Sequence, residues 1–117
     1  MLIKVETSNF HLPGSRDPTK WNGPFTFALL ADPQLGLFKN NHSWEEELQQ
    51  VQDCIAASAA LQPQPAFILV LGDLVHAPVP AHNSGPNAEA IRTVRDQQAR
   101  DLQMVLDKPS GDVPVAQ

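Results

Sequence analysis

Two short hydrophobic runs separated by an amphipathic segment constrain the fold of this 117-residue chain more than any other feature. The runs, residues 25–31 and 66–71, are rich in Phe, Ile, Leu and Val, which is typical of strands buried on both faces of a sheet. The segment between them predicts a helix. A strand-helix-strand unit of this kind makes its two strands parallel neighbours joined by a right-handed crossover. The sequence therefore predicts an α/β fold.

The first predicted helix begins near residue 43. Ser43 is expected to be its N-cap, with Glu46 three residues later completing a capping box. One face is apolar, because hydrophobic residues recur at three- and four-residue steps: Trp44, Leu48, Val51, Ile55 and Ala59. Acids at residues 45–47 occupy the first turn, where the helix dipole favours negative charge, and we expect their side chains to be solvated.

The second half of the chain continues this alternation. After a proline-rich loop over 77–87, a second helix is expected over 88–107, with one stripe formed by Ile91, Val94, Gln98, Leu102 and Val105. A third strand is expected to start at 113–115. Two helices cannot cover both faces of such a parallel sheet, so the pattern predicts the β-α-β-α opening portion of a larger, truncated α/β domain. So small a core predicts marginal stability.

Each predicted strand is followed directly by an acid. Asp32 follows the first strand and Asp73 the second, and ligands bind at the carboxyl ends of parallel strands. Two carboxylates at one edge repel each other unless a cation lies between them. With Gln34 and His76 nearby in sequence, the pattern indicates a hard divalent cation or a mixed nitrogen and oxygen site. Alternatively, Asp-Pro and Gly-Asp are common turn dipeptides, and either acid could simply end a strand or cap a helix.

Charge and composition exclude some partners and set the expected compartment. A net charge of −5 and a pI near 5.1 argue against nucleic acid or an anionic membrane surface as a partner. The apolar runs are too short to span a bilayer, and residues 1–17 do not form a signal peptide. The single cysteine, Cys54, fits a reducing compartment. We therefore expect a soluble, cytoplasmic protein, and the composition indicates no oligomeric state.

The motifs after the two strands resemble those of the calcineurin-like metallophosphoesterases. That family has Asp-x-His after its first strand and Gly-Asp-x-x-(Asp/His) after its second. This chain has Asp32-Pro33-Gln34 and Gly72-Asp73-Leu74-Val75-His76. The wider string over residues 23–37 is similar to the subgroup of calcineurin-like phosphoesterase domain-containing serine/threonine phosphatases, in which Gln replaces the usual His. The resemblance implies that residues 21–117 are the N-terminal part of such a domain, after an irregular lead-in over residues 1–20.

The resemblance also implies a two-metal phosphatase site. Asp32 would ligate the first metal, Asp73 would bridge both, and Gln34 would lie beside the first metal as a neutral oxygen ligand or a water-holding group. His76 would form a hydrogen bond or ligate, with an ordinary loop histidine as the alternative. The implied cofactors are two divalent cations (Mn, Fe, Zn or Mg). The implied activity is hydrolysis of a phosphorylated substrate, more narrowly of phosphoserine or phosphothreonine in a phosphoprotein.

Other motifs of that family do not occur in the 117 residues. The Gly-Asn-His-(Asp/Glu) and Gly-His-x-His blocks are missing, and the remaining histidines match no motif and are expected at the surface: His11, His42 and His82. No catalytic residue is therefore assigned, and we expect an incomplete or inactive fragment that binds metal weakly. The alternative is a non-catalytic binding or regulatory fragment with only the first half of the fold. A phosphohydrolase with an aspartate nucleophile is less favoured, because it needs a second Asp in place of Gln34.

Overall fold

The computed structural model describes residues 23–80 and 85–117, over which strands and helices alternate. In chain order the elements are β1 (Ala28–Ala31), α1 (Glu45–Ala59), β2 (Ile68–Leu71), the short 3-10 helix η1 (Gly85–Asn87), α2 (Ala88–Leu106) and β3 (Val115–Ala116). The expected lead-in over residues 1–20, together with His11 and His82, lies outside the described residues. The division of the chain near residue 20 therefore stays a prediction.

The three strands form one parallel sheet in the order β1-β2-β3. Ala31 at the end of β1 lies opposite Leu71 at the end of β2, so these two strands end at the same level. Ile68 of β2 lies opposite Val115 of β3. A parallel sheet with two helices confirms the predicted α/β class. The register also brings the carboxyl ends of β1 and β2 to one edge, where the candidate ligands follow.

β1 is shorter than the strand expected over residues 25–31, with four residues in regular pairing. The carbonyl of Thr26 still accepts a hydrogen bond from the backbone N–H of Ala66 (2.8 Å), so the two segments are already paired before the strands begin. Pro24 and Pro65 stand just ahead of these paired residues and cannot donate to a ladder. Regular strand structure is confined to the last four residues of each hydrophobic run.

Helix α1 begins at Glu45 with Trp44 as its N-cap, so the prediction that Ser43 caps the helix is wrong. No side chain caps this end. The backbone N–H of Glu45 contributes most to lowering the pKa of the exposed Glu45 carboxyl, and a hydrogen bond from the Ser43 hydroxyl lowers it further. Within the described ranges, neither helix is long and apolar enough to cross a membrane.

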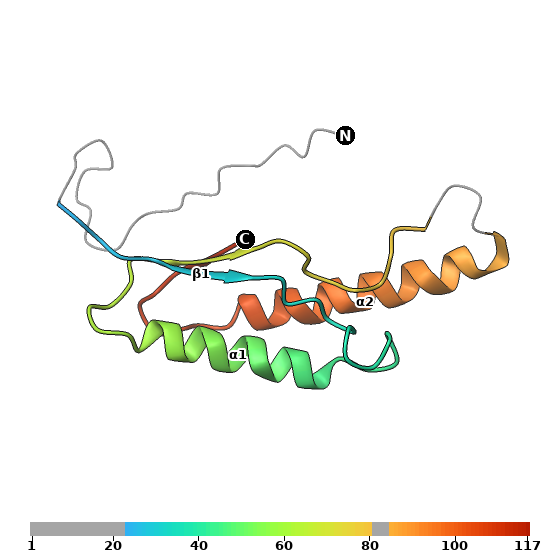
Figure 1. Ribbon diagram of the computed structural model, residues 1–117, viewed down its shortest axis with the longest axis horizontal. Helices are drawn as coiled ribbons and strands as arrows, with labels where there is room; N and C mark the ends of the chain where they lie inside the picture. Colours follow the sequence, from blue (N-terminus) through green and yellow to red (C-terminus); the bar gives the residue numbers. More distant parts are fainter. Residues whose placement is uncertain (1–22, 81–84) are drawn as a thin grey trace.

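Both helices lie on the same face of the sheet (Figure 1). The core fills the space between this face and the helices, and its buried side chains include Val51, Ile55, Ile68, Val70, Leu102, Val105 and Leu106. A hydrogen bond from the Trp44 indole N–H to the Asp101 carboxylate (2.8 Å) joins the start of α1 to α2. Helix α2 therefore contacts both the sheet and the region from which α1 begins.

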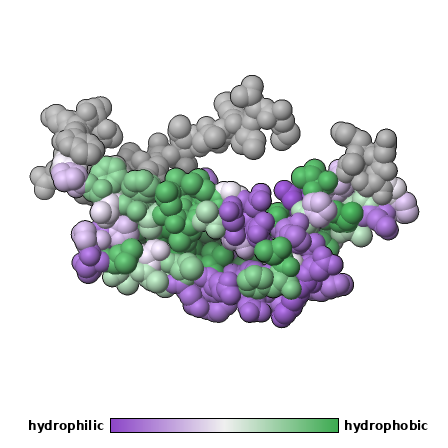
Figure 2. Space-filling view, viewed as in Figure 1, coloured by the Kyte–Doolittle hydropathy of each residue, from purple (hydrophilic) through white to green (hydrophobic). Residues whose placement is uncertain are grey.

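The opposite face of the sheet carries exposed aromatic side chains. Phe25, Phe27 and Leu29 are 46%, 49% and 55% exposed, and the ring of Phe27 stacks on that of Phe67 at 5.0 Å between centroids. Figure 2 shows hydrophobic side chains over the strands and hydrophilic ones along the first half of α1. The expectation that both strands are buried on both faces is therefore wrong for the described residues, because both helical connections pass over the same face.

Candidate functional site

The loops that follow β1 and β2 run side by side at one edge of the sheet. We call residues 32–44 the first loop and residues 72–80 the second loop. A parallel bridge between Leu35 and Val75 continues the pairing of the strands into these loops. The second loop returns to the first once more, where the His76 N–H donates to the carbonyl of Leu35 (2.9 Å). The β-α-β pattern predicted this juxtaposition.

The two predicted acids meet where the loops leave the sheet. The Asp32 N–H donates to the carbonyl of Leu71 (2.9 Å), and the Gln34 N–H donates to the carbonyl of Asp73 (2.9 Å). The Oδ1 atom of Asp32 accepts a hydrogen bond from the Asp73 N–H (3.2 Å). Both acids are exposed. Hydrogen bonds therefore hold Asp32, Gln34 and Asp73 beside one another at one edge of the sheet.

Gly72 leaves the space that the Asp32 carboxylate occupies. A Cβ atom built on Gly72 would lie 2.0 Å from Oδ1 of Asp32, far inside van der Waals contact, and the φ of Gly72 is +83°. The positive φ favours glycine, and a side chain here would require the Asp32 carboxylate to move. In the Gly72-Asp73 dipeptide, the glycine leaves space for Oδ1 of Asp32, and the Asp73 N–H donates a hydrogen bond to that oxygen.

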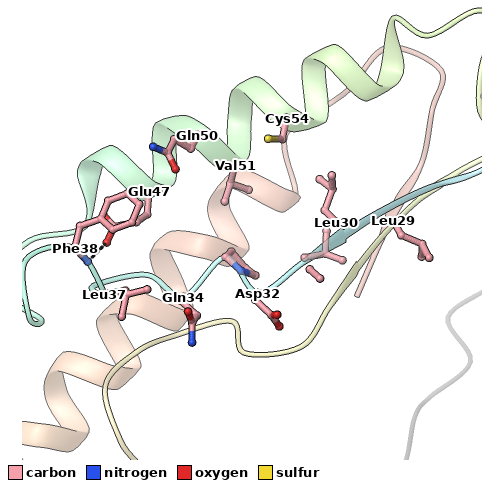
Figure 3. A pocket seen from close by; sticks show the side chains of 13 residues that line it. Leu29, Leu30, Asp32, Gln34, Leu37, Phe38, Glu47, Gln50, Val51 and Cys54 are labelled. Carbon is pink, nitrogen blue, oxygen red and sulfur yellow. Dashed lines mark hydrogen bonds between the residues drawn. The ribbon is translucent and has the colours of Figure 1, made fainter.

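The first loop holds two residues in a sparsely populated backbone conformation. Asp32 has a φ of +54° and Gln34 a φ of +39°, although neither is glycine. Such conformations cost about 1–3 kcal/mol each and gather at functional sites. Figure 3 shows that both side chains leave the loop on the side away from helix α1. The Asp-Pro-Gln sequence carried no clear signal for these positive φ values.

The donor set suits one side of a divalent cation's coordination shell. Over residues 23–80 and 85–117, no group of three or more His, Cys, Asp or Glu side chains gathers as a metal site. Asp32, Asp73 and Gln34 instead carry two carboxylates and one carboxamide, oxygen ligands of the kind that Mg²⁺ and Mn²⁺ accept. Three ligands would leave half of a six-ligand shell to other groups or water. His76 lies half-buried in the second loop, three residues after Asp73.

Glu47 supports the first loop from helix α1. It is 3% exposed, and its Oε1 accepts hydrogen bonds from the backbone N–H groups of Gly36 (3.2 Å) and Phe38 (3.0 Å). Its Oε2 is buried without a hydrogen-bond partner. The expectation that the acids at 45–47 are all solvated is therefore wrong for Glu47, because the first loop folds back over the start of the helix and supplies N–H groups that need an acceptor.

Gln98 supports both loops from helix α2. Its side chain is fully buried. Its Oε1 accepts from the Ala77 N–H (3.0 Å) and its Nε2 donates to Oδ1 of Asn41 (2.9 Å). The only sequence signal was the occurrence of glutamine in an otherwise apolar helical stripe, which does not reveal its partners.

A cavity of about 330 Å³ opens beside Asp32, between β1 and α1. Figure 3 shows its lining, which combines the candidate ligands Asp32 and Gln34 with an apolar wall that includes Leu37, Phe38, Val51 and Val70. A partly apolar space next to polar donors is a common setting for a ligand. Because the Asp32 and Gln34 side chains point away from α1, this cavity lies on the opposite side of the first loop from their side-chain oxygens.

The chain is similar in sequence to curated proteins named serine/threonine-protein phosphatase CPPED1. It is 36% identical over 105 residues to the Danio rerio protein, a match that covers 82% of this chain and 30% of that protein. The Bos taurus protein is 34% identical over 110 residues, with 86% and 32% covered, and the Homo sapiens protein is 32% identical over 106 residues, with 83% and 30% covered. No family model and no solved structure matches the chain.

These relatives confirm the resemblance to the calcineurin-like phosphoesterase domain-containing serine/threonine phosphatases that the motifs indicated. The chain spans about 30% of the length of the curated relatives it matches. This share is consistent with the prediction that the chain holds part of a larger α/β domain.

Proposed function

We propose that this relative of the CPPED1 phosphatases supplies half of a metal-dependent phosphomonoesterase site, with Asp32, Gln34 and Asp73 as its oxygen ligands. One observation carries the proposal. The Asp32 carboxylate occupies the space beside Gly72 and accepts a hydrogen bond from the Asp73 N–H, at the edge where two parallel strands end. An acid that only ends a strand would not require a glycine opposite its carboxylate. The proposed substrate class is phosphoserine or phosphothreonine in a phosphoprotein, in line with the names of the relatives.

Each residue has a distinct proposed role. Divalent cations bound here would neutralise a phosphoryl group and lower the pKa of a bound water. Asp32 binds through the oxygens that its cradle orients, and Asp73 can bridge two ions because a carboxylate has two oxygens. Gln34 offers a neutral amide oxygen or holds a water. His76 is a hydrogen-bonding neighbour of this set, and the metals are divalent ions such as Mn, Fe, Zn or Mg.

The proposed role of the chain by itself is metal binding without turnover. The sequence lacks the Gly-Asn-His and Gly-His-x-His blocks of the family, so it offers no imidazole assigned to protonate a leaving group. The same lack supports the second candidate, a non-catalytic binding or regulatory fragment. We also propose a cytoplasmic location, which the exposed and unpaired thiol of Cys54 supports because free thiols persist in reducing compartments.

Titration of the chain with Mn²⁺ tests the proposal. Paramagnetic broadening of amide signals should reach Asp32 and Gln34 first, disappear in Asp73→Asn and persist in Asp96→Asn, an exposed acid on α2 that serves as the matched control. A wild-type chain without site-specific broadening would refute the metal site. An aryl phosphate assay completes the test, because metal-dependent hydrolysis that Asp73→Asn abolishes would show that the chain is catalytically complete.

A further inference from the structure

The two loops that carry the candidate ligands are attached to the same helix. Asn41, in the first loop, and Ala77, in the second, both hydrogen-bond to the carboxamide of Gln98. The two bonds use opposite ends of one rigid, planar group, so the carboxamide spans the gap between the loops. Both hydrogen bonds are formed in one orientation of the carboxamide, and a rotation of this group would disturb both of them.

Helix α2 binds both backbone polar groups of Ala77 in the second loop. While the Ala77 N–H donates to Gln98, the Ala77 carbonyl accepts a hydrogen bond from Nη1 of Arg95, one turn earlier on α2. Ala77 itself is 2% exposed. Helix α2 thus binds this residue through two side chains, four residues after Asp73.

The first loop is packed directly on the same carboxamide. A Cβ atom on Gly36 would lie 2.3 Å from Nε2 of Gln98 and 2.6 Å from Oδ1 of Asn41, so backbone without a side chain is needed at this point. Gly36 is two residues after Gln34. On its other side the Gly36 N–H is bound by Glu47, so the loop is held between α1 and α2.

We propose that Gln98 is a positioning residue that ties both ligand-bearing loops to helix α2 and thereby sets the spacing of Asp32 and Asp73. This inference rests on the proposed metal site for its effect on binding, but its effect on the loops is independent of any metal. A polar group buried at the boundary of a core contributes little net stability when satisfied, whereas its unpaired partners are costly. The proposed role of the Gln98 carboxamide is therefore to fix the distance between the two loops.

Gln98→Met removes both hydrogen bonds at nearly constant volume, and Val105→Ala is the matched control in the same buried stripe of α2. Hydrogen exchange of the Gln34 amide reports the bond between the loops, because this N–H donates to Asp73. We expect about tenfold faster exchange at Gln34 in Gln98→Met, since one hydrogen bond commonly corresponds to about that factor. Val105→Ala should accelerate exchange in the core of α2 and leave Gln34 unchanged.

Mn²⁺ titration gives the second measurement. In the wild type the amides of both loops should broaden with one common midpoint, since the same ion contacts both. Loss of a supporting partner commonly weakens metal binding about 10- to 100-fold, so Gln98→Met should raise this midpoint by at least tenfold and separate the midpoints of the two loops. Val105→Ala should keep them coincident and unshifted.

The outcomes are distinguishable. Unchanged Gln34 exchange in Gln98→Met, or the same loop exchange in Gln98→Met and Val105→Ala, would overturn the positioning role. A wild type that binds no Mn²⁺ would overturn the proposed function, while the exchange data would still decide the role of Gln98. If Gln98→Met does not fold, two variants of Asn41 provide the test. Asn41→Asp keeps the acceptor oxygen for Gln98 and should behave as wild type. Asn41→Gly removes this acceptor and should loosen the loops.

Discussion

Replacing Gly72 with alanine should displace the Asp32 carboxylate, and the structure allows the cost to be separated into parts. An alanine at a φ of +83° costs about 1–2 kcal/mol of folding stability in the backbone alone. Its Cβ also takes the place of Oδ1 of Asp32, which breaks the hydrogen bond from the Asp73 N–H, worth about 1 kcal/mol. We therefore expect Gly72→Ala to lower the free energy of unfolding by about 2–3 kcal/mol.

Gly111→Ala isolates the first part, the backbone cost. Gly111 has a φ of +66°, but a Cβ there meets no atom within 4 Å, so its substitution should cost the backbone part only, about 1–2 kcal/mol. Urea unfolding of both variants in metal-free buffer provides the comparison. In an Asp32→Ala background the clash is absent, so Gly72→Ala should then cost no more than Gly111→Ala. Equal costs of the two glycine substitutions in the wild type would refute the reasoning.

Three further substitutions test the support of the site and the core. Glu47→Ala should lower the free energy of unfolding by about 2–3 kcal/mol, because two backbone N–H groups lose their acceptor, and chemical denaturation against Glu47→Gln, which keeps an acceptor oxygen, measures the effect. Ser43→Ala should raise the depressed pKa of Glu45 in an NMR titration. Because a depressed pKa stabilises the fold above the unfolded-state pKa and loses this effect as pH falls through the folded-state pKa, the variant should also be less sensitive to acid. Leu102→Ala should cost about 2–5 kcal/mol in thermal unfolding, and a cost below 1 kcal/mol would contradict its place in the core.

The sequence predicted those parts of the structure that periodicity determines. Two apolar runs around an amphipathic helix are sufficient to specify parallel neighbours, and parallel neighbours bring Asp32 and Asp73 to one edge. The strand ends were less predictable, because hydrophobicity extends over the whole of each run and does not show where regular pairing begins. The exposed sheet face was missed because periodicity does not say on which side of a sheet successive connections pass.

The support of the loops could not be read from the sequence because it depends on partners that are distant along the chain. Glu47 and its neighbours Glu45 and Glu46 look alike in sequence, yet only Glu47 faces the N–H groups of the first loop. The capping box at Ser43 fits the sequence pattern but is not formed, because the helix begins one residue later, with Trp44 as its N-cap. Gln98 in an apolar stripe was visible as an exception, and tertiary structure was needed to explain it.

During synthesis, Gln98 is added to the chain after both of the loops that it joins. Asn41 and Gln98 are 57 residues apart, and Asp32 and Asp73 are both translated before the glutamine that joins their loops. At a ribosomal rate of about 5–20 residues per second, the nascent loops wait on the order of seconds for this residue. β1, α1 and β2 are therefore synthesised before Gln98 can join the two loops, and docking of α2 is the event that joins them.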